Sequence, residues 1–172
     1  MTTLVVTDLD GTVWDGALAC HPSTLAAIAD LRARDNVEIM VATGRRRNSA
    51  RRAYDLNGFT LPSVLLNGAI GFDFVTESIF HQVTFRADHL QQTLAVLRSY
   101  DLAPVAYLTD TRAFALQGVT TSMKHLDGLG QDLHWCSAAE LMGRTDVLGM
   151  SMLGIDIAAV EPALADLGAL VG

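Results

Sequence analysis

Several features that mark particular classes of protein are scarce in this sequence. It contains 2 cysteines and 4 prolines in 172 residues. Cys20 and Cys136 show neither metal-ligand spacing nor a disulfide framework, so we expect free thiols in a reducing compartment. No apolar run approaches the roughly 20 residues of a membrane-spanning helix, and the first residues lack the basic stretch of a signal peptide. These absences predict a cytoplasmic protein with no membrane partner.

Basic charge is scarce as well. The chain has 12 lysines and arginines against 19 acidic residues, a net charge of −7, which opposes binding to nucleic acid. Arginines do cluster between residues 45 and 52, but no aromatic side chains are interleaved with them, and Arg51 has Asp55 one helical turn later as a partner. We therefore expect a solvated helix face here and no nucleic-acid partner.

Half of the residues are hydrophobic and 18% are charged, which is typical of a globular chain. A chain of this length fits one domain, or one domain and part of a second.

The first apolar run, Leu4–Val6, delivers two acidic residues into a glycine turn. The run has no polar alternation, which predicts a strand of a parallel sheet that is covered on both faces. Asp8 and Asp10 follow it two residues apart, so both face the same space where the strand ends, and Gly11 then turns the chain. In open α/β sheets this edge is where ligands bind.

Two carboxylates held this close suit a cation between them or one retained proton. Mg²⁺ takes one or two protein carboxylates and leaves room for a phosphate, and an aspartate can also act as a covalent nucleophile. The alternative is an ordinary Asp-Gly turn with solvated acids.

A second strand ends beside the first. Residues 22–35 have a helical pattern that begins at proline, and Val37–Ala42 is a second apolar run. A strand, a helix and a strand in succession form a right-handed crossover with parallel strands, which places Thr43 and Gly44 next to Asp8. The Thr43 hydroxyl and the following amides would then reach a phosphate, and Arg45 is a candidate for substrate contact. A strand-ending turn without a ligand is the alternative.

The third strand, residues 63–66, ends on the same edge by the same logic. Asn67 follows it, and the chemistry alone leaves open whether Asn67 lines a site or simply starts a turn. Residues 69–82 then have the pattern of a β-hairpin.

Three segments carry a resemblance to a known family. They are Asp-Leu-Asp-Gly-Thr at residues 8–12, Ala-Thr-Gly-Arg at 42–45 and Leu-Leu-Asn-Gly-Ala at 65–69. The chain resembles the haloacid dehalogenase (HAD) superfamily of aspartate-dependent phosphohydrolases and phosphotransferases, in its Cof-type branch with a type IIB cap. The resemblance implies an α/β fold: a Rossmann-like, doubly wound parallel sheet core with an α/β cap domain. It places part of the core at residues 1–82 and the cap at 83–172, with the chain ending inside the cap.

The resemblance also implies a Mg²⁺-dependent phosphatase of small phosphorylated metabolites that works through an aspartyl-phosphate. Asp8 is then the nucleophile, Asp10 the acid and base, and both belong to the metal site. The residues implied in phosphate binding are Leu9, Thr43, Gly44, Arg45 and Asn67.

Two parts of the family's machinery have no match in this sequence. The lysine that balances charge at the nucleophile is missing, because Lys124 falls in the cap segment, and so is the late acidic motif that completes the metal site. We therefore expect weak phosphatase activity or none from these residues alone. Phosphotransfer to a sugar hydroxyl and a non-catalytic binding module are the alternatives. The incomplete sheet also predicts an open edge that favours self-association.

Overall fold

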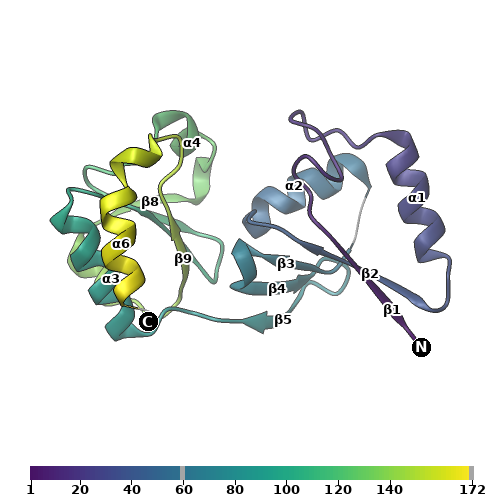
Figure 1. Ribbon diagram of the computed structural model, residues 1–172, viewed down its shortest axis with the longest axis horizontal. Coiled ribbons are helices and arrows are strands. Elements are labelled where there is room, and N and C mark those ends of the chain that lie inside the picture. The colour runs from purple at the N-terminus through teal and green to yellow at the C-terminus, as the bar shows by residue number, and fades with distance from the viewer. Residues whose placement is uncertain (59–60, 171–172) are drawn as a thin grey trace. The chain divides into compact units, whose positions relative to one another are not determined.

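The computed structural model describes residues 1–58 and 61–170, and the chain divides into two compact units, Met1–Val83 and Thr84–Gly172 (Figure 1). Each unit has its own sheet. The sequence predicts that the chain ends within the cap. Its last two residues, 171 and 172, lie outside the described part. Among the described residues, no helix has both the length and the apolar character that crossing a membrane requires.

The first unit is built on a sheet of order β1-β2-β3-β4-β5. β1, β2 and β3 are parallel, and β4 and β5 add an antiparallel hairpin. The elements are β1 (Thr3–Thr7), α1 (Pro22–Arg32), β2 (Val37–Ala42), α2 (Arg47–Asn57), β3 (Ser63–Leu65), η1 (Leu66–Gly68), β4 (Ile70–Asp73) and β5 (Ser78–Gln82). The predicted α/β fold with a Rossmann-like parallel core is confirmed.

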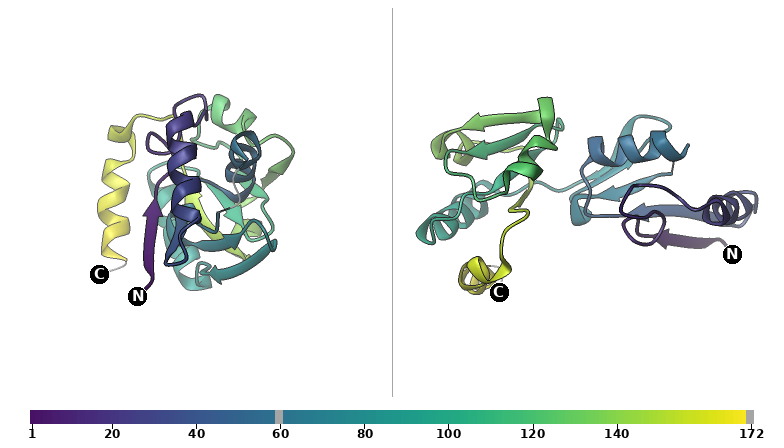
Figure 2. Two further views of the ribbon diagram at one scale, coloured as in Figure 1. Left: turned by 90° about the vertical axis from the view of Figure 1, so that its right-hand side faces the viewer. Right: turned by 90° about the horizontal axis from the view of Figure 1, so that it is seen from above.

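One face of this sheet is covered by helices. Since β1, β2 and β3 step in one direction and both crossovers are right-handed, α1 and α2 lie on the same face. Ile39, Val41 and Ser63 share that face by their register and are buried. Figure 2 shows β1 beside α1 at the margin of the sheet.

The prediction that β1 is covered on both faces is wrong. Leu4 and Val6, which point to the face opposite the helices, are 57% and 54% exposed. An apolar run without alternation predicts two covered faces, but the two crossovers supply helices to only one of them. Val5, on the helix side, is half-buried.

Aromatic side chains join α2 to the sheet. Tyr54 is 1% exposed, shares a 2.6 Å hydrogen bond with the Ser63 hydroxyl, and its ring lies 4.7 Å from that of Phe74. The guanidinium of Arg51 stacks on Phe74 and pairs with Glu77, so the predicted partner Asp55 is wrong. The segment that joins β4 to β5 supplies both the Phe74 ring and the Glu77 carboxylate, and a sequence pattern within one helix cannot predict partners from another segment.

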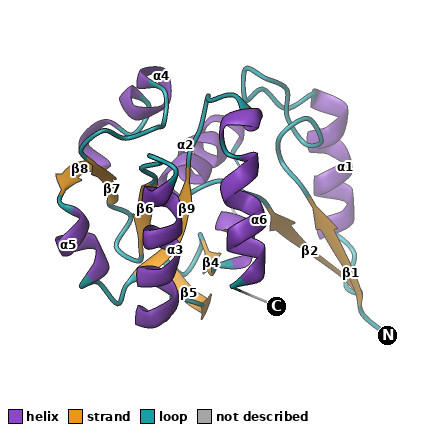
Figure 3. Ribbon diagram, turned by 60° about the vertical axis from the view of Figure 1, so that its left-hand side comes forward, coloured by secondary structure: helices purple, strands orange, loops and turns teal. Residues whose placement is uncertain are grey.

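The second unit has a four-stranded sheet of order β8-β7-β6-β9, in which only β7 and β8 are parallel (Figure 3). Its elements are α3 (Ala87–Ser99), β6 (Val105–Leu108), β7 (Ala113–Leu116), α4 (Met123–Asp127), η2 (Gly130–Asp132), β8 (Leu133–Cys136), α5 (Ala138–Met142), β9 (Val147–Ser151), η3 (Ile157–Ala159) and α6 (Glu161–Ala169).

The core of the second unit lies between this sheet and two helices. Leu90 and Leu94 of α3 and Leu141 of α5 pack with Phe114 and Leu116 of β7. The buried leucines of α3 recur at helical spacing and predict that helix. The elements from α4 to α5 are short, and no periodic pattern in the sequence predicts them.

We predict that the hydroxyl of Tyr54 stabilises the first unit. Tyr54→Phe leaves the Ser63 hydroxyl with its bond to the Leu61 carbonyl and is expected to lower the free energy of unfolding by about 1 kcal/mol. The matched control is Tyr100→Phe, which removes a hydroxyl bonded to Asp166 at an exposed position and is expected to cost less than about 0.5 kcal/mol. Urea denaturation followed by circular dichroism measures both, and equal losses would contradict the prediction.

Burial of Tyr54 also predicts a loss of stability at high pH. Desolvation raises the pKa of Tyr54 to about 12, from an ordinary value of 10. The neutral phenol is therefore favoured by folding, and its contribution is complete below pH 10 and lost as pH rises from 10 to 12. Two pH units correspond to about 3 kcal/mol at most. The unfolding free energy of wild type should fall more steeply over this range than that of Tyr54→Phe, and parallel curves would contradict this.

Candidate active site

The turn after β1 is organised by Leu9. Its side chain is fully buried, and its carbonyl accepts hydrogen bonds from the backbone N–H groups of Thr12, Val13 and Trp14. Gly11 takes the positive φ of 72° that closes the turn. With Leu9 turned inward, Asp8 and Asp10 on either side of it are both exposed.

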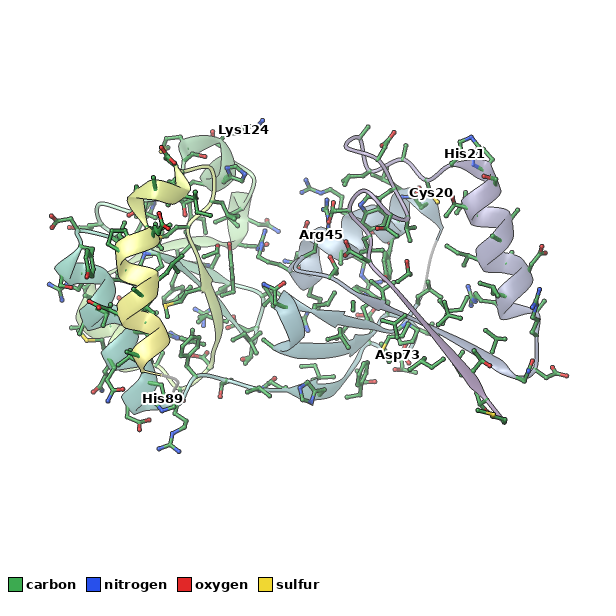
Figure 4. The ribbon with its side chains drawn as sticks, viewed as in Figure 1. Cys20, His21, Arg45, Asp73, His89 and Lys124 are labelled. Atoms are coloured by element: carbon green, nitrogen blue, oxygen red, sulfur yellow. The ribbon has the colours of Figure 1, made fainter. Side chains whose placement is uncertain are left out.

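Asp10 is held by Arg45, which follows β2. The guanidinium donates from Nε to Oδ2 at 2.7 Å and from a terminal nitrogen to Oδ1 at 2.5 Å, a two-point ion pair. Its other terminal nitrogen donates to the Ser49 hydroxyl at 2.9 Å, so the first turn of α2 fixes Arg45 from behind. Arg45 projects from the loop between β2 and α2 (Figure 4).

Trp14 forms the floor beneath this ion pair. Its side chain is 3% exposed, its indole N–H donates to Asp10 Oδ1 at 3.2 Å, and the Arg45 guanidinium carbon lies 5.4 Å from its ring centre. A cation over an indole face is attracted to it, so Trp14 supports both members of the pair.

These contacts change the acidity of Asp10. Hydrogen bonding from Arg45, more than any other cause, holds the pKa of Asp10 below its ordinary value, with a smaller contribution from Trp14 and an opposing effect of burial. Asp10 is therefore an ionised carboxylate at neutral pH in this arrangement.

The loops after β2 and β3 meet. Thr43 is buried, its hydroxyl accepts the N–H of Arg45 at 3.3 Å, and its carbonyl accepts the N–H of Asn67 at 3.4 Å. A Cβ atom at Gly44 would lie 2.8 Å from the Asn67 side-chain oxygen, so a larger residue here would have to displace the Asn67 amide. Asn67 is exposed and has a φ of 54°, a left-handed conformation that asparagine tolerates better than most residues.

The predicted site residues thus gather at the carboxyl ends of three neighbouring strands. The register pairs Thr7 with Val41, so Asp8 is level with Ala42 and Thr43 follows one residue on. Asp10 touches Arg45, and Gly44 faces Asn67. Leu9 contributes only its backbone here, because its side chain points into the core.

Metal ligands are few at this site. Within residues 1–58 and 61–170, no group of three His, Cys, Asp or Glu side chains gathers as a metal site would require. Lys124 belongs to α4 of the second unit (Figure 4).

Two residues of this site, Trp14 and Ser49, are not predicted by the sequence patterns. Trp14 lies four residues after Asp10, and Ser49 lies four residues after Arg45. The second spacing is a usual one for side-chain contacts near a helix start, whereas the first depends on a turn that no periodicity describes.

Structures of known proteins share this fold. A HAD subclass IIB sugar phosphatase, BT4131, matches with a TM-score of 0.70 and 18% identity over 97% of this chain and 64% of that one. A haloacid dehalogenase-like hydrolase from B. subtilis matches with a TM-score of 0.66 and 18% identity, covering 84% and 59%. The phosphatase BT1666 from Bacteroides thetaiotaomicron has a TM-score of 0.64 and 19% identity, covering 86% and 54%. The chain spans less than two thirds of the length of each.

No curated protein matches the sequence. A family model does: the one described as haloacid dehalogenase-like hydrolase matches residues 5–132, which include all of the residues assembled at the three strand ends. The chain therefore belongs to the haloacid dehalogenase-like hydrolase family.

Proposed function

We propose that this chain is a Mg²⁺-dependent phosphatase of small phosphorylated metabolites, sugar phosphates among them, which works through an aspartyl-phosphate. The observation that carries the proposal is the pair of exposed carboxylates, of which Asp10 is fixed by Arg45 and Asp8 is left beside it at the strand ends. Among the described residues no ion pair engages the Asp8 carboxylate, and an open carboxylate next to an oriented one fits a nucleophile and its proton-transfer partner. The similarity to a sugar phosphatase supports the substrate class.

Each residue of the site has a proposed role. Asp8 attacks phosphorus, and Asp10 protonates the leaving oxygen and then activates water. Thr43, Asn67 and the backbone amides of Leu9 and Gly44 hold the phosphoryl oxygens. The second unit serves as a cap that excludes water and selects the leaving group.

The two free cysteines, Cys20 and Cys136, support a reducing compartment, the cytoplasm.

The residues present fit Mg²⁺ in part. This ion commonly takes one or two carboxylates with waters and substrate phosphate, and Asp8 and Asp10 supply two. Both oxygens of Asp10 accept hydrogen bonds from Arg45, so Asp8 is the carboxylate more open to an ion. When bound, Mg²⁺ would neutralise charge on the phosphoryl group.

Arg45 has a proposed part in substrate entry. A phosphate dianion placed beside Asp8 competes with Asp10 for the same guanidinium, because arginine binds either anion at two points. As the guanidinium turns toward phosphate, Asp10 loses its strongest partner and its pKa rises, which suits the acid role.

We further propose that residues 1–172 alone hydrolyse phosphate esters slowly or not at all. Loss of one preorganised charge stabiliser commonly costs a factor of about 10² to 10³ in rate. The only lysine, Lys124, lies in the second unit, and no third acid joins Asp8 and Asp10 within the described residues. A binding protein without catalysis is the second candidate, favoured by the same two observations.

We predict that the site binds beryllofluoride, a mimic of an aspartyl-phosphate, in the presence of Mg²⁺. ¹⁹F NMR should show a bound resonance with wild type, because binding needs Asp8 but not full turnover. Asp8→Asn should lose the signal, and Asp30→Asn, at an exposed position of α1, should keep it. A wild-type spectrum without a bound resonance, or a signal that survives in Asp8→Asn, would reject Asp8 as the nucleophile.

We predict that Arg45→Gln raises the pKa of Asp10 toward its ordinary value, because Arg45 is the largest cause of its lowering. Carbon-detected NMR titration of the side-chain carboxyl measures this. Arg52→Gln, at an exposed position of α2, is the control and should leave the midpoint unchanged. The same midpoint in both variants would contradict the role of the ion pair.

A further inference from the structure

We propose that Trp14 is a positioning residue for Asp10: its indole N–H keeps the carboxylate in place when Arg45 turns toward phosphate, and Oδ2 is left as the oxygen that carries the proton. The role in catalysis rests on the proposed phosphatase function. The hydrogen bonds and the packing that hold the carboxylate do not depend on that function. Trp14 lies in the loop after β1, four residues beyond Asp10.

The two oxygens of Asp10 have different donors. Oδ1 accepts a hydrogen bond from a terminal nitrogen of Arg45 at 2.5 Å and another from the indole N–H of Trp14 at 3.2 Å. Oδ2 accepts from Arg45 Nε alone, at 2.7 Å, among the residues that the structure describes. Removal of the guanidinium therefore leaves Oδ1 with the indole donor and Oδ2 without a donor from these residues.

This difference decides where a proton resides on Asp10. The indole N–H can only donate, and a carbonyl oxygen accepts a hydrogen bond more strongly than the hydroxyl oxygen of a carboxylic acid. A protonated Asp10 therefore keeps its stronger bond to Trp14 when the proton lies on Oδ2. Oδ1 then anchors the side chain, and Oδ2 is free to give a proton to the leaving oxygen and to take one from water.

Trp14 is anchored without the help of Arg45. Its side chain is 3% exposed, and its ring meets that of Tyr54 edge to face, with 6.3 Å between the ring centres. Its backbone N–H donates to the Leu9 carbonyl at 3.1 Å, and its carbonyl accepts the N–H of Gly11 at 2.9 Å. None of these contacts involves the guanidinium, so the indole stays in place when the guanidinium leaves.

Arg45 contacts the same ring in another way. Its guanidinium carbon lies 5.4 Å from the ring centre of Trp14, a distance at which a cation is attracted to the ring face. That attraction is less directional than a hydrogen bond, which needs the N–H aimed at the oxygen. Trp14 therefore holds Asp10 in one place while Arg45 can shift over the ring.

NMR couplings across the Cα–Cβ bond of Asp10 test the positioning, because they show whether the side chain keeps one staggered rotamer or averages over several. Wild type, Trp14→Phe and Arg45→Gln should each keep one rotamer, since one donor remains in each. The double variant Trp14→Phe/Arg45→Gln should average. The matched control is Trp135→Phe/Arg45→Gln, which removes the exposed tryptophan of β8 and should keep one rotamer. Circular dichroism checks that each variant folds.

Solvent exchange of the indole N–H gives a second measurement that does not need the double variant. The chain has 2 tryptophans, so the signal of Trp135, which is 56% exposed, serves as the reference within the same protein. Asp10→Ala should speed exchange at Trp14 several-fold and leave Trp135 unchanged. Arg45→Gln, and wild type with beryllofluoride and Mg²⁺, should keep exchange at Trp14 slow.

Rotamer averaging in Arg45→Gln alone overturns the proposal, because Trp14 then does not hold Asp10. A single rotamer in the double variant overturns it as well, since another group then holds the carboxylate, and so does unchanged indole exchange in Asp10→Ala. A wild type that binds no beryllofluoride overturns the acid role of Asp10 instead. The failure of the phosphatase function is therefore distinct from the failure of the positioning by Trp14.

Discussion

The ion pair between Arg45 and Asp10 is the contact on which the arrangement of the site depends. It joins the loop after β1 to the loop after β2, and Trp14 and Ser49 hold its two members from below and behind. A two-point guanidinium–carboxylate pair fixes orientation as well as distance. The pair therefore sets where the Asp10 carboxylate stands relative to Asp8, before any substrate or metal is present.

The handedness of the crossovers has a second consequence for this chain. The same rule that brings Asp8, Thr43 and Asn67 to one edge also sends α1 and α2 to one face. The site is therefore assembled by three strands and two helices, while Leu4 and Val6 stay exposed. In this fold the strand ends can therefore come together to form the site even though one face of β1 has no helix over it.

This separation explains what the sequence could predict. Short apolar runs and glycine turns locate the strand ends, and chain order with handedness then places Asp8, Thr43 and Asn67 on one edge. The partners of the arginines could not be predicted, because Arg51 meets Glu77 and Arg45 meets Asp10 across long stretches of chain. The prediction for Leu4–Val6 was wrong for a related reason. An apolar run shows that both faces of a strand could be covered, but the crossovers of this unit place helices on one face only.

The chemistry proposed for Asp10 requires an order of events. An acid must hold a proton when the leaving oxygen departs, yet Arg45 and Trp14 favour the ionised carboxylate. If phosphate binds first and draws the guanidinium away, the main cause of the low pKa of Asp10 is removed, and the pKa moves in the direction that the acid role requires. Ser49 allows such a movement, because it holds a different nitrogen of Arg45 from the two that bind Asp10. In the proposed mechanism Arg45 would turn while Ser49 holds its other terminal nitrogen, and proton transfer would depend on an occupied phosphate site.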